Sequence, residues 1–85
     1  MTYRIQLTKT AVRDLGAVPK NMLQRLDTCI LRLAGDPLPQ GVKKLRNSGG
    51  MYRIRVSDYR IIYRVEQEVL TILVVKIGHR REVYR

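Results

Sequence analysis

The sequence contains no tryptophan, no phenylalanine and only one cysteine among its 85 residues. Because tyrosine is then the sole aromatic residue type, the packing of a core has to rest on Leu, Ile and Val. The single Cys29 excludes an intrachain disulfide and a cysteine-cluster metal site, and its place in an apolar pattern indicates core filler. We expect no metal and no other cofactor.

Long apolar runs are also missing. None approaches the ~20 residues that span a bilayer, and the opening MTYRIQLTKT carries charge where a signal peptide would be apolar. We therefore expect a cytoplasmic protein with no membrane partner. Its 85 residues, 45% of them hydrophobic, predict a single folded domain over residues 1–85.

Acidic residues are scarce. Seven Asp+Glu oppose 17 Lys+Arg, which gives a net charge of +10. Residues 1–36 carry six cations and three anions, whereas residues 37–85 carry eleven cations and four anions. This excess is larger than solubility requires, and it indicates a polyanionic partner such as a nucleic acid.

The first half of the chain predicts a strand and two helices. Residues 2–7 alternate apolar and polar side chains, as a half-buried strand does. The first helix, capped by Thr8 or Thr10, ends at Gly16, and the second starts at Pro19. The second helix has one apolar stripe, formed by Leu23, Leu26, Ile30 and Leu33.

The second half predicts three strands, over residues 51–57, 59–65 and 69–77, joined by turns short enough for antiparallel neighbours. The last strand is nearly all apolar and suits a central position. The order β-α-α-β-β-β predicts an α+β fold, in which a small antiparallel sheet carries an N-terminal helical hairpin packed on one face.

The hairpin YRIRVSDYRIIYR separates its side chains by face. With a two-residue loop at Ser57-Asp58, Arg55 lies opposite Arg60, and one face of the hairpin is apolar and takes the helices. We call the other face the arginine face. No acidic residue is expected on it, and its cations are Arg53, Arg55, Arg60 and Arg64.

Such crowding has a cost, because like charges facing each other across strands destabilise a sheet by about 0.2–1 kcal/mol per pair. One interpretation is that these arginines only solvate an open sheet face. Lysine and glutamate would do so without same-sign crowding, and the planar guanidinium fork suits phosphate oxygens. The sequence therefore favours a phosphate-binding surface.

Together with the ending GHRREVYR, this hairpin resembles the RelE/ParE toxin superfamily, and RelE-type mRNA interferases in particular. The resemblance spans essentially the whole chain, including YRIQL, KKLR, MYRIRVSDYRIIYRV and EVY in one order. It implies a RelE-like toxin of a type II toxin–antitoxin system that cleaves mRNA in the ribosomal A site without a metal. The implied partners are the ribosome, mRNA and an acidic RelB-like antitoxin in a toxin–antitoxin hetero-oligomer.

The same resemblance implies catalytic residues by position. Arg53, Arg55 and Arg60 would hold the phosphate that the ribose 2′-OH attacks, and Arg80 would stabilise the leaving 5′ oxygen. Tyr84 would stack on an exposed base or act as the general base. The family often has lysine where this chain has Arg53 and Arg55. Because arginine effectively never releases a proton, an electrostatic role is indicated for both.

His79 could transfer the proton that these arginines cannot, because an imidazole titrates near neutral pH. The alternative is an exposed histidine in a polar tail. Further cations are expected to contact phosphates of RNA or the ribosome without reading sequence: Lys43, Lys44, Arg46, Arg64, Arg81 and Arg85.

Two other functions stay open at this point. One is a ParE-like inhibitor of DNA gyrase, with the same fold and no nuclease site. The other is an RNA-binding module without catalytic activity.

Overall fold

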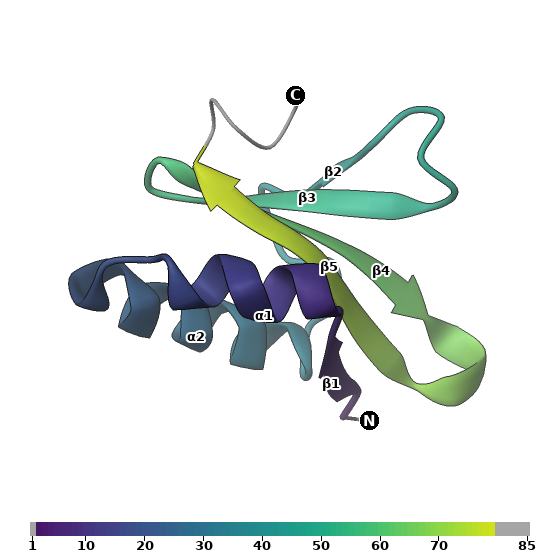
Figure 1. Cartoon of the computed structure of the whole chain (residues 1–85). Coiled ribbons are helices and arrows are strands. Elements are labelled where there is room, and N and C mark those ends of the chain that lie inside the picture. Colours follow the sequence, from purple (N-terminus) through teal and green to yellow (C-terminus); the bar gives the residue numbers. More distant parts are fainter. Residues whose placement is uncertain (1, 80–85) are drawn as a thin grey trace.

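The computed structural model of the protein describes residues 2–79. In chain order its elements are β1 (Arg4–Leu7), α1 (Lys9–Gly16), α2 (Lys20–Leu33), β2 (Lys43–Lys44), β3 (Met51–Val56), β4 (Tyr59–Glu66), the 3-10 turn η1 (Gln67–Val69) and β5 (Thr71–His79). The helices lie together on one side of the sheet (Figure 1). The predicted α+β class and N-terminal helical hairpin are confirmed. Neither helix in this part of the chain is long and apolar enough to cross a membrane.

The described strands form one five-stranded sheet in the order β1-β5-β4-β3-β2. β5 is an interior strand between β1 and β4, whereas the middle strand of the sheet is β4 and not, as the apolar sequence of the last strand predicts, β5. The prediction of an antiparallel sheet is wrong at β1, which runs parallel to β5, so the sheet is mixed. A two-residue edge strand, β2, was also not predicted; it pairs antiparallel with β3. Alternation of side chains identifies a strand but carries no information about its direction, and two residues are too few to alternate.

The hydrophobic core lies between the helices and the apolar face of the sheet. The helices contribute Ala11, Leu26, Ile30 and Leu33, and the sheet contributes Ile61, Tyr63, Ile72, Val74 and Ile77. Three of the four predicted stripe residues of the second helix are in this list. Tyr63 is the one aromatic side chain in this buried set, so aliphatic packing carries most of the core, as the composition predicts.

The helix ends follow local sequence. Thr8, rather than Thr10, caps α1, because its Oγ1 accepts a hydrogen bond from the Ala11 N–H at 3.1 Å. Pro19 occupies the cap position of α2, and its carbonyl accepts from the Leu23 N–H at 2.9 Å. Helix α2 ends at Leu33, shortly before the sequence Gly35-Asp36-Pro37, in which glycine and proline disfavour a continued helix.

Tyr63 ties the segment after α2 to the core. Its ring is fully buried and its hydroxyl donates a hydrogen bond of 2.7 Å to the Pro37 carbonyl. The ring centroid of Tyr52, its partner across the hairpin, lies 6.0 Å away. Burial is the main cause that raises the pKa of the Tyr63 hydroxyl, so the hydroxyl stays protonated and keeps donating.

Tyr63→Phe should lower the free energy of unfolding by about 1–2 kcal/mol, because it removes the donor to the Pro37 carbonyl. Urea denaturation measures this loss. Tyr3→Phe is the control and should change stability by less than about 0.5 kcal/mol.

The pH dependence provides a second readout of the same change. Because the pKa of Tyr63 is raised in the folded protein, its contribution is complete below the ordinary tyrosine pKa of about 10 and declines as the pH rises above it. The Tyr63→Phe variant has no hydroxyl to titrate at this position, so its free energy of unfolding should fall less steeply above about pH 10 than that of the unaltered protein. Equal effects of Tyr63→Phe and Tyr3→Phe would contradict the role assigned to the hydroxyl.

Candidate nucleic-acid interface

The β3–β4 hairpin has the register of a two-residue loop. Arg55 lies opposite Arg60 and Val56 lies opposite Tyr59. Ser57 in the turn has a φ of +55°, the left-handed conformation that tight hairpin turns require. The predicted placement is therefore confirmed: one face of the hairpin, opposite the core, carries Arg53, Arg55, Arg60 and Arg64.

Two lysines extend the arginine face on either side. Lys43 in β2 lies opposite Arg53, and Lys76 in β5 lies opposite Ile62, which itself lies opposite Arg53. One row across the sheet thus reads Lys43, Arg53, Ile62, Lys76. Lys76 is absent from the site predicted from sequence, although a lone charge within an apolar strand is a signal that could have indicated it.

The cations of the arginine face differ in exposure. Arg60 is only 8% exposed, Arg53 and Arg64 are half-buried, and Arg55 is exposed. Arg60 lies between Arg55 on β3 and Gly78 on β5, a residue with no side chain to cover it. A guanidinium held in a partly dehydrated position attracts a phosphate more strongly than one in bulk water.

A cavity of about 400 Å³ opens at the β3 edge of this face. Its cationic walls come from Lys43, Arg53 and Arg55, and the segment before β2 closes it with Gln40 and Gly41. Three positive side chains around one small cavity can hold an anion of the size of a phosphate.

The Gly49-Gly50 turn supports Arg64. Gly49 and Gly50 have φ values of +73° and +90°, which glycine adopts at the least cost. A Cβ on Gly49 would lie 3.4 Å from the Arg64 Nη2, so the guanidinium lies against the backbone of the turn. The turn before β3 therefore also positions one cation of the face.

One expectation for the arginine face is wrong at its far end. Strand β4 runs one residue further than predicted, and it brings Glu66 onto this face opposite Thr71. Glu66 comes two positions after Arg64, whereas the Arg55–Arg60 pair lies at the other end of the hairpin. Within the described strands, no acidic residue lies opposite any of the four arginines.

His79 lies on the other face. Strand β5 does not end at Gly78 but continues to His79, which lies opposite Tyr59, and the two rings are 5.7 Å apart at 79°. Both line a cavity of about 320 Å³ that also includes Asp14 on α1. The structure therefore does not bring His79 together with the arginines.

The remaining predicted site residues divide into two groups. Lys44 lies opposite Tyr52 and so projects to the core side, and Arg46 is exposed in the following loop. Four others lie outside the described residues: Arg80, Arg81, Tyr84 and Arg85.

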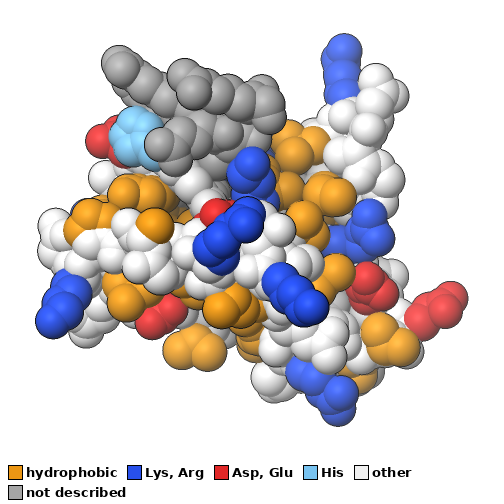
Figure 2. Space-filling view, in the orientation of Figure 1, with side chains coloured by type: hydrophobic (Ala, Val, Ile, Leu, Met, Phe, Trp, Pro, Cys, Tyr) orange, Lys and Arg blue, Asp and Glu red, His pale blue; other side chains and the backbone are white. Residues whose placement is uncertain are grey.

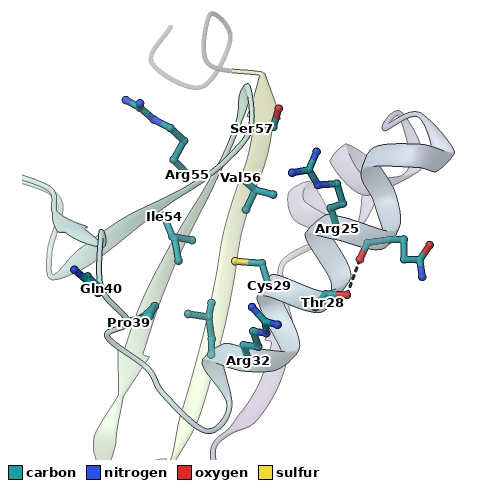
Figure 3. A pocket seen from close by; sticks show the side chains of 12 residues that line it. Arg25, Thr28, Cys29, Arg32, Pro39, Gln40, Ile54, Arg55, Val56 and Ser57 are labelled. Carbon is teal, nitrogen blue, oxygen red and sulfur yellow. Dashed lines mark hydrogen bonds between the residues drawn. The ribbon is translucent and has the colours of Figure 1, made fainter.

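A groove of about 650 Å³ separates β3 from α2 on the helix side of the sheet. Ile54 and Val56 point from β3 toward α2, Cys29 points back toward them, and Arg55 points away (Figure 3). Two cations of α2 also line the groove, namely Arg25 and Arg32. The floor of the groove is thus apolar and its helix side is basic.

Cys29 contributes to this groove as an apolar wall. Burial raises the pKa of its thiol, and the charge of Arg32 opposes this by a smaller amount. The thiol is therefore protonated at neutral pH, which agrees with its prediction as a packing residue.

The side of the molecule that α1 covers differs from the arginine face in how its charged side chains are distributed. Its basic side chains form separate patches among hydrophobic and uncharged ones (Figure 2). The ordered rows of cations on the sheet face opposite the helices follow from the strand pairing.

This combination of fold and basic face defines a small RelE-like toxin domain. A toxin–antitoxin complex RelBE2 of Mycobacterium tuberculosis contains a similar chain, with a TM-score of 0.84, 30% identity, and coverage of 94% of this chain and 100% of that one. An archaeal RelE–RelB complex of Pyrococcus horikoshii is similar at a TM-score of 0.83 and 33% identity, covering 98% of this chain and 100% of that one.

The sequence comparisons give the family. A profile described as the ParE toxin of type II toxin–antitoxin system, parDE, matches residues 5–84. Toxin RelG of Mycobacterium tuberculosis is 31% identical over 86 residues, covering 100% of this chain and 99% of RelG. The chain belongs to the ParE toxin family of type II toxin–antitoxin systems, within the RelE/ParE superfamily.

Arg55→Gln should raise the free energy of unfolding by about 0.2–1 kcal/mol, because it removes one of two like charges that face each other across β3 and β4. Urea denaturation at low ionic strength measures the gain, and added salt should shrink it through screening. Arg25→Gln, an exposed arginine of α2, is the control and should show no gain. Equal stabilities of Arg55→Gln and the unaltered protein at low salt would refute the proposed repulsion.

Proposed function

We propose that this toxin is a ribosome-dependent endoribonuclease, which cleaves mRNA in the A site by attack of a ribose 2′-OH on the adjacent phosphate. The observation that carries the proposal is the arginine face, with Arg55 opposite Arg60 and a row of further cations beside them. The names of similar chains, toxins RelG and RelE, support the same assignment. A ribosomal target would place its action in the cytoplasm.

The cleavage passes through a phosphorane-like transition state in which negative charge accumulates on the phosphate oxygens. Fixed cations around that phosphate stabilise the transition state more than the ground state. Arg60, buried and central, is suited to hold the scissile phosphate, and Arg53 and Arg55 lie beside it on β3. Arginine stays charged throughout the cycle, so these residues act electrostatically and require no metal.

The carboxy-terminal segment is assigned the base and the stabilisation of the leaving group. By resemblance to the family, Tyr84 stacks on a base or, as the phenolate, accepts the 2′-OH proton, and Arg80 stabilises the leaving 5′ oxygen, which takes its proton from water. Both lie outside the described residues. We leave His79 out of the reacting groups, because it shares the helix side of the sheet with Tyr59.

Two other functions compete with this one. The matching family profile is described as a ParE toxin, which favours a gyrase inhibitor that binds protein and has no nuclease site. A ParE-like target does not require paired arginines on an open sheet face, and for this reason we rank it second. A non-catalytic RNA-binding module would use the same face without cleaving.

We further propose that a cognate acidic antitoxin binds the groove between α2 and β3. The similar chains of Mycobacterium tuberculosis and Pyrococcus horikoshii come from complexes with a RelB antitoxin. The groove offers an apolar floor for a helix or strand, and Arg25 and Arg32 lie where acidic side chains of that segment could bind.

Arg60→Lys should lower cleavage of mRNA on programmed ribosomes by more than tenfold, because lysine keeps the charge but lacks the fork that binds two phosphate oxygens. Arg60→Ala and Arg80→Ala should show losses at least as large. Mapping of the 5′ ends of the message measures cleavage within the codon. Arg13→Lys on α1 is the control and should cleave at the unaltered rate.

The competing functions give different results in the same preparation. Loss of DNA supercoiling by gyrase with an intact message would support the ParE-like function. Binding of RNA without any cut would support the third function. Rates close to the unaltered protein in both Arg60 variants would refute the assignment of the site.

Reversing two charges beside the groove should weaken antitoxin binding. Arg25→Glu with Arg32→Glu should raise the dissociation constant for the acidic antitoxin by more than tenfold, while cleavage by the free toxin stays unchanged, because both residues are on α2 and not on the arginine face. Isothermal titration calorimetry measures the affinity. Lys9→Glu with Arg13→Glu on α1 carries the same net change and should bind normally; an equal loss in both pairs would argue against the groove.

A further inference from the structure

Lys76 is on the arginine face only because β5 contains a β-bulge. Tyr63 lies opposite Val74, but the preceding Ile62 lies opposite Lys76, so Val75 is an extra residue in β5. Val74 is fully buried in the core. In a regular strand Lys76, two positions later, would point into the core as well. The bulge turns it to the opposite face.

Thr8, the N-cap of α1, and Asp14 within α1 hold this bulge in place. Strand β1 ends at Leu7, so the edge of β5 beyond Val74 has no neighbouring strand on that side. Thr8 supplies the hydrogen bonds at this edge. Its N–H donates to the Val74 carbonyl at 3.0 Å, and its Oγ1 donates to the Val75 carbonyl at 2.6 Å. Asp14 Oδ2 accepts from the Ile77 N–H at 3.0 Å.

These bonds satisfy backbone groups that the sheet leaves unpaired, and they specify one register for the end of β5. The same register places Ile77 in the core, 2% exposed. It also places Gly78, which has no side chain, opposite Arg60. The bulge therefore shapes the face where the scissile phosphate would bind.

Lys76 completes a row of cations across this face. It and Arg53 flank the buried Ile62, and neighbouring strands are about 4.8 Å apart, so their backbones are about 10 Å from each other. Lys76 is half-buried, which fixes its stem while its ammonium group can reach the surface. Arg60 is on the neighbouring strand, one row along.

We propose that Lys76 binds a phosphate of the single-stranded RNA that lies across the arginine face, next to the phosphate held by Arg60, and that Thr8 positions Lys76 through the bulge. This inference rests on the proposed RNA substrate of the same face. Its alternative is that Lys76 merely solvates the open side of a central strand.

The test uses the full chain and a single-stranded oligoribonucleotide in which every 2′ oxygen is methylated, so that it cannot be cleaved. Binding is measured over a series of salt concentrations. Lys76→Gln should weaken binding by about three- to tenfold and should reduce the slope of log K against log salt by about 0.7, the value for one phosphate contact on a single strand. Lys76→Arg should retain the slope.

Lys20→Gln, an exposed lysine at the start of α2, is the matched control and should keep the unaltered slope. Equal slopes for Lys76→Gln and Lys20→Gln would overturn the proposal, and so would no binding of the oligonucleotide by the unaltered protein.

Thr8 provides a second, independent variant. Thr8→Val removes the bond to the Val75 carbonyl together with the cap of α1, and it should reproduce the reduced slope of Lys76→Gln, whereas Thr8→Ser keeps both bonds and the slope of the unaltered protein. In the double variant Thr8→Val with Lys76→Gln, the slope should fall no further, because both changes remove the same contact. A further fall would refute the positioning role of Thr8.

Failure of the Lys76 proposal can be distinguished from failure of the proposed nuclease activity. Binding with the Lys76-dependent slope, but with no cut on programmed ribosomes, would leave Lys76 a phosphate-binding residue and refute the nuclease. Normal cleavage with an unchanged slope in Lys76→Gln would support the nuclease and refute the phosphate contact of Lys76.

Discussion

The repulsion between Arg55 and Arg60, held directly opposite each other on adjacent strands, is the constraint that the rest of the structure has to outweigh. Such a pair costs about 0.2–1 kcal/mol, whereas burying one large aliphatic side chain contributes about 1.5–3 kcal/mol. The same two strands place Ile61 and Tyr63 in the core, both fully buried. Strand alternation therefore couples the two faces: the residues that fix the register for packing also fix the arginines at close spacing. A stable core on one face makes an unfavourable arrangement of charge on the other face permanent, and the phosphate proposed to bind there would relieve it.

The hairpin could be predicted from the sequence because the residues that determine its register are close together in the chain. Alternating arginine and aliphatic residues around a two-residue turn leave one register, and it is the observed one. The direction of β1 and the bulge in β5 could not be predicted in this way. At the bulge, Thr8 donates a hydrogen bond to the Val75 carbonyl across 67 positions of sequence, and nothing in the sequence near Val75 indicates this contact. The candidate site shows the same division. The four arginines follow from local parity, whereas Lys76 was missed because the bulge reverses that parity before it. His79 was expected in a tail after Gly78, but β5 continues through that glycine and places it beside Tyr59.

Strand β3 relates the two proposed binding surfaces. Arg55 projects to one side, and Ile54 and Val56 project into the groove beside α2 (Figure 3). An antitoxin segment that fills only this groove can contact Arg55, which also lines it, but does not cover Arg53, Arg60 or Arg64. Neutralisation by such a segment has to act through the strand itself or through a second segment that reaches the other face.

Strand β3 can be displaced by a segment in the groove, because its outer neighbour β2 supplies only two residues of pairing. Pressure on Ile54 or Val56 would shift Arg53 and Arg55 together, since alternate residues of one strand move as a unit. A small displacement in the groove would thus change the spacing of the cations to which the proposed chemistry is most sensitive.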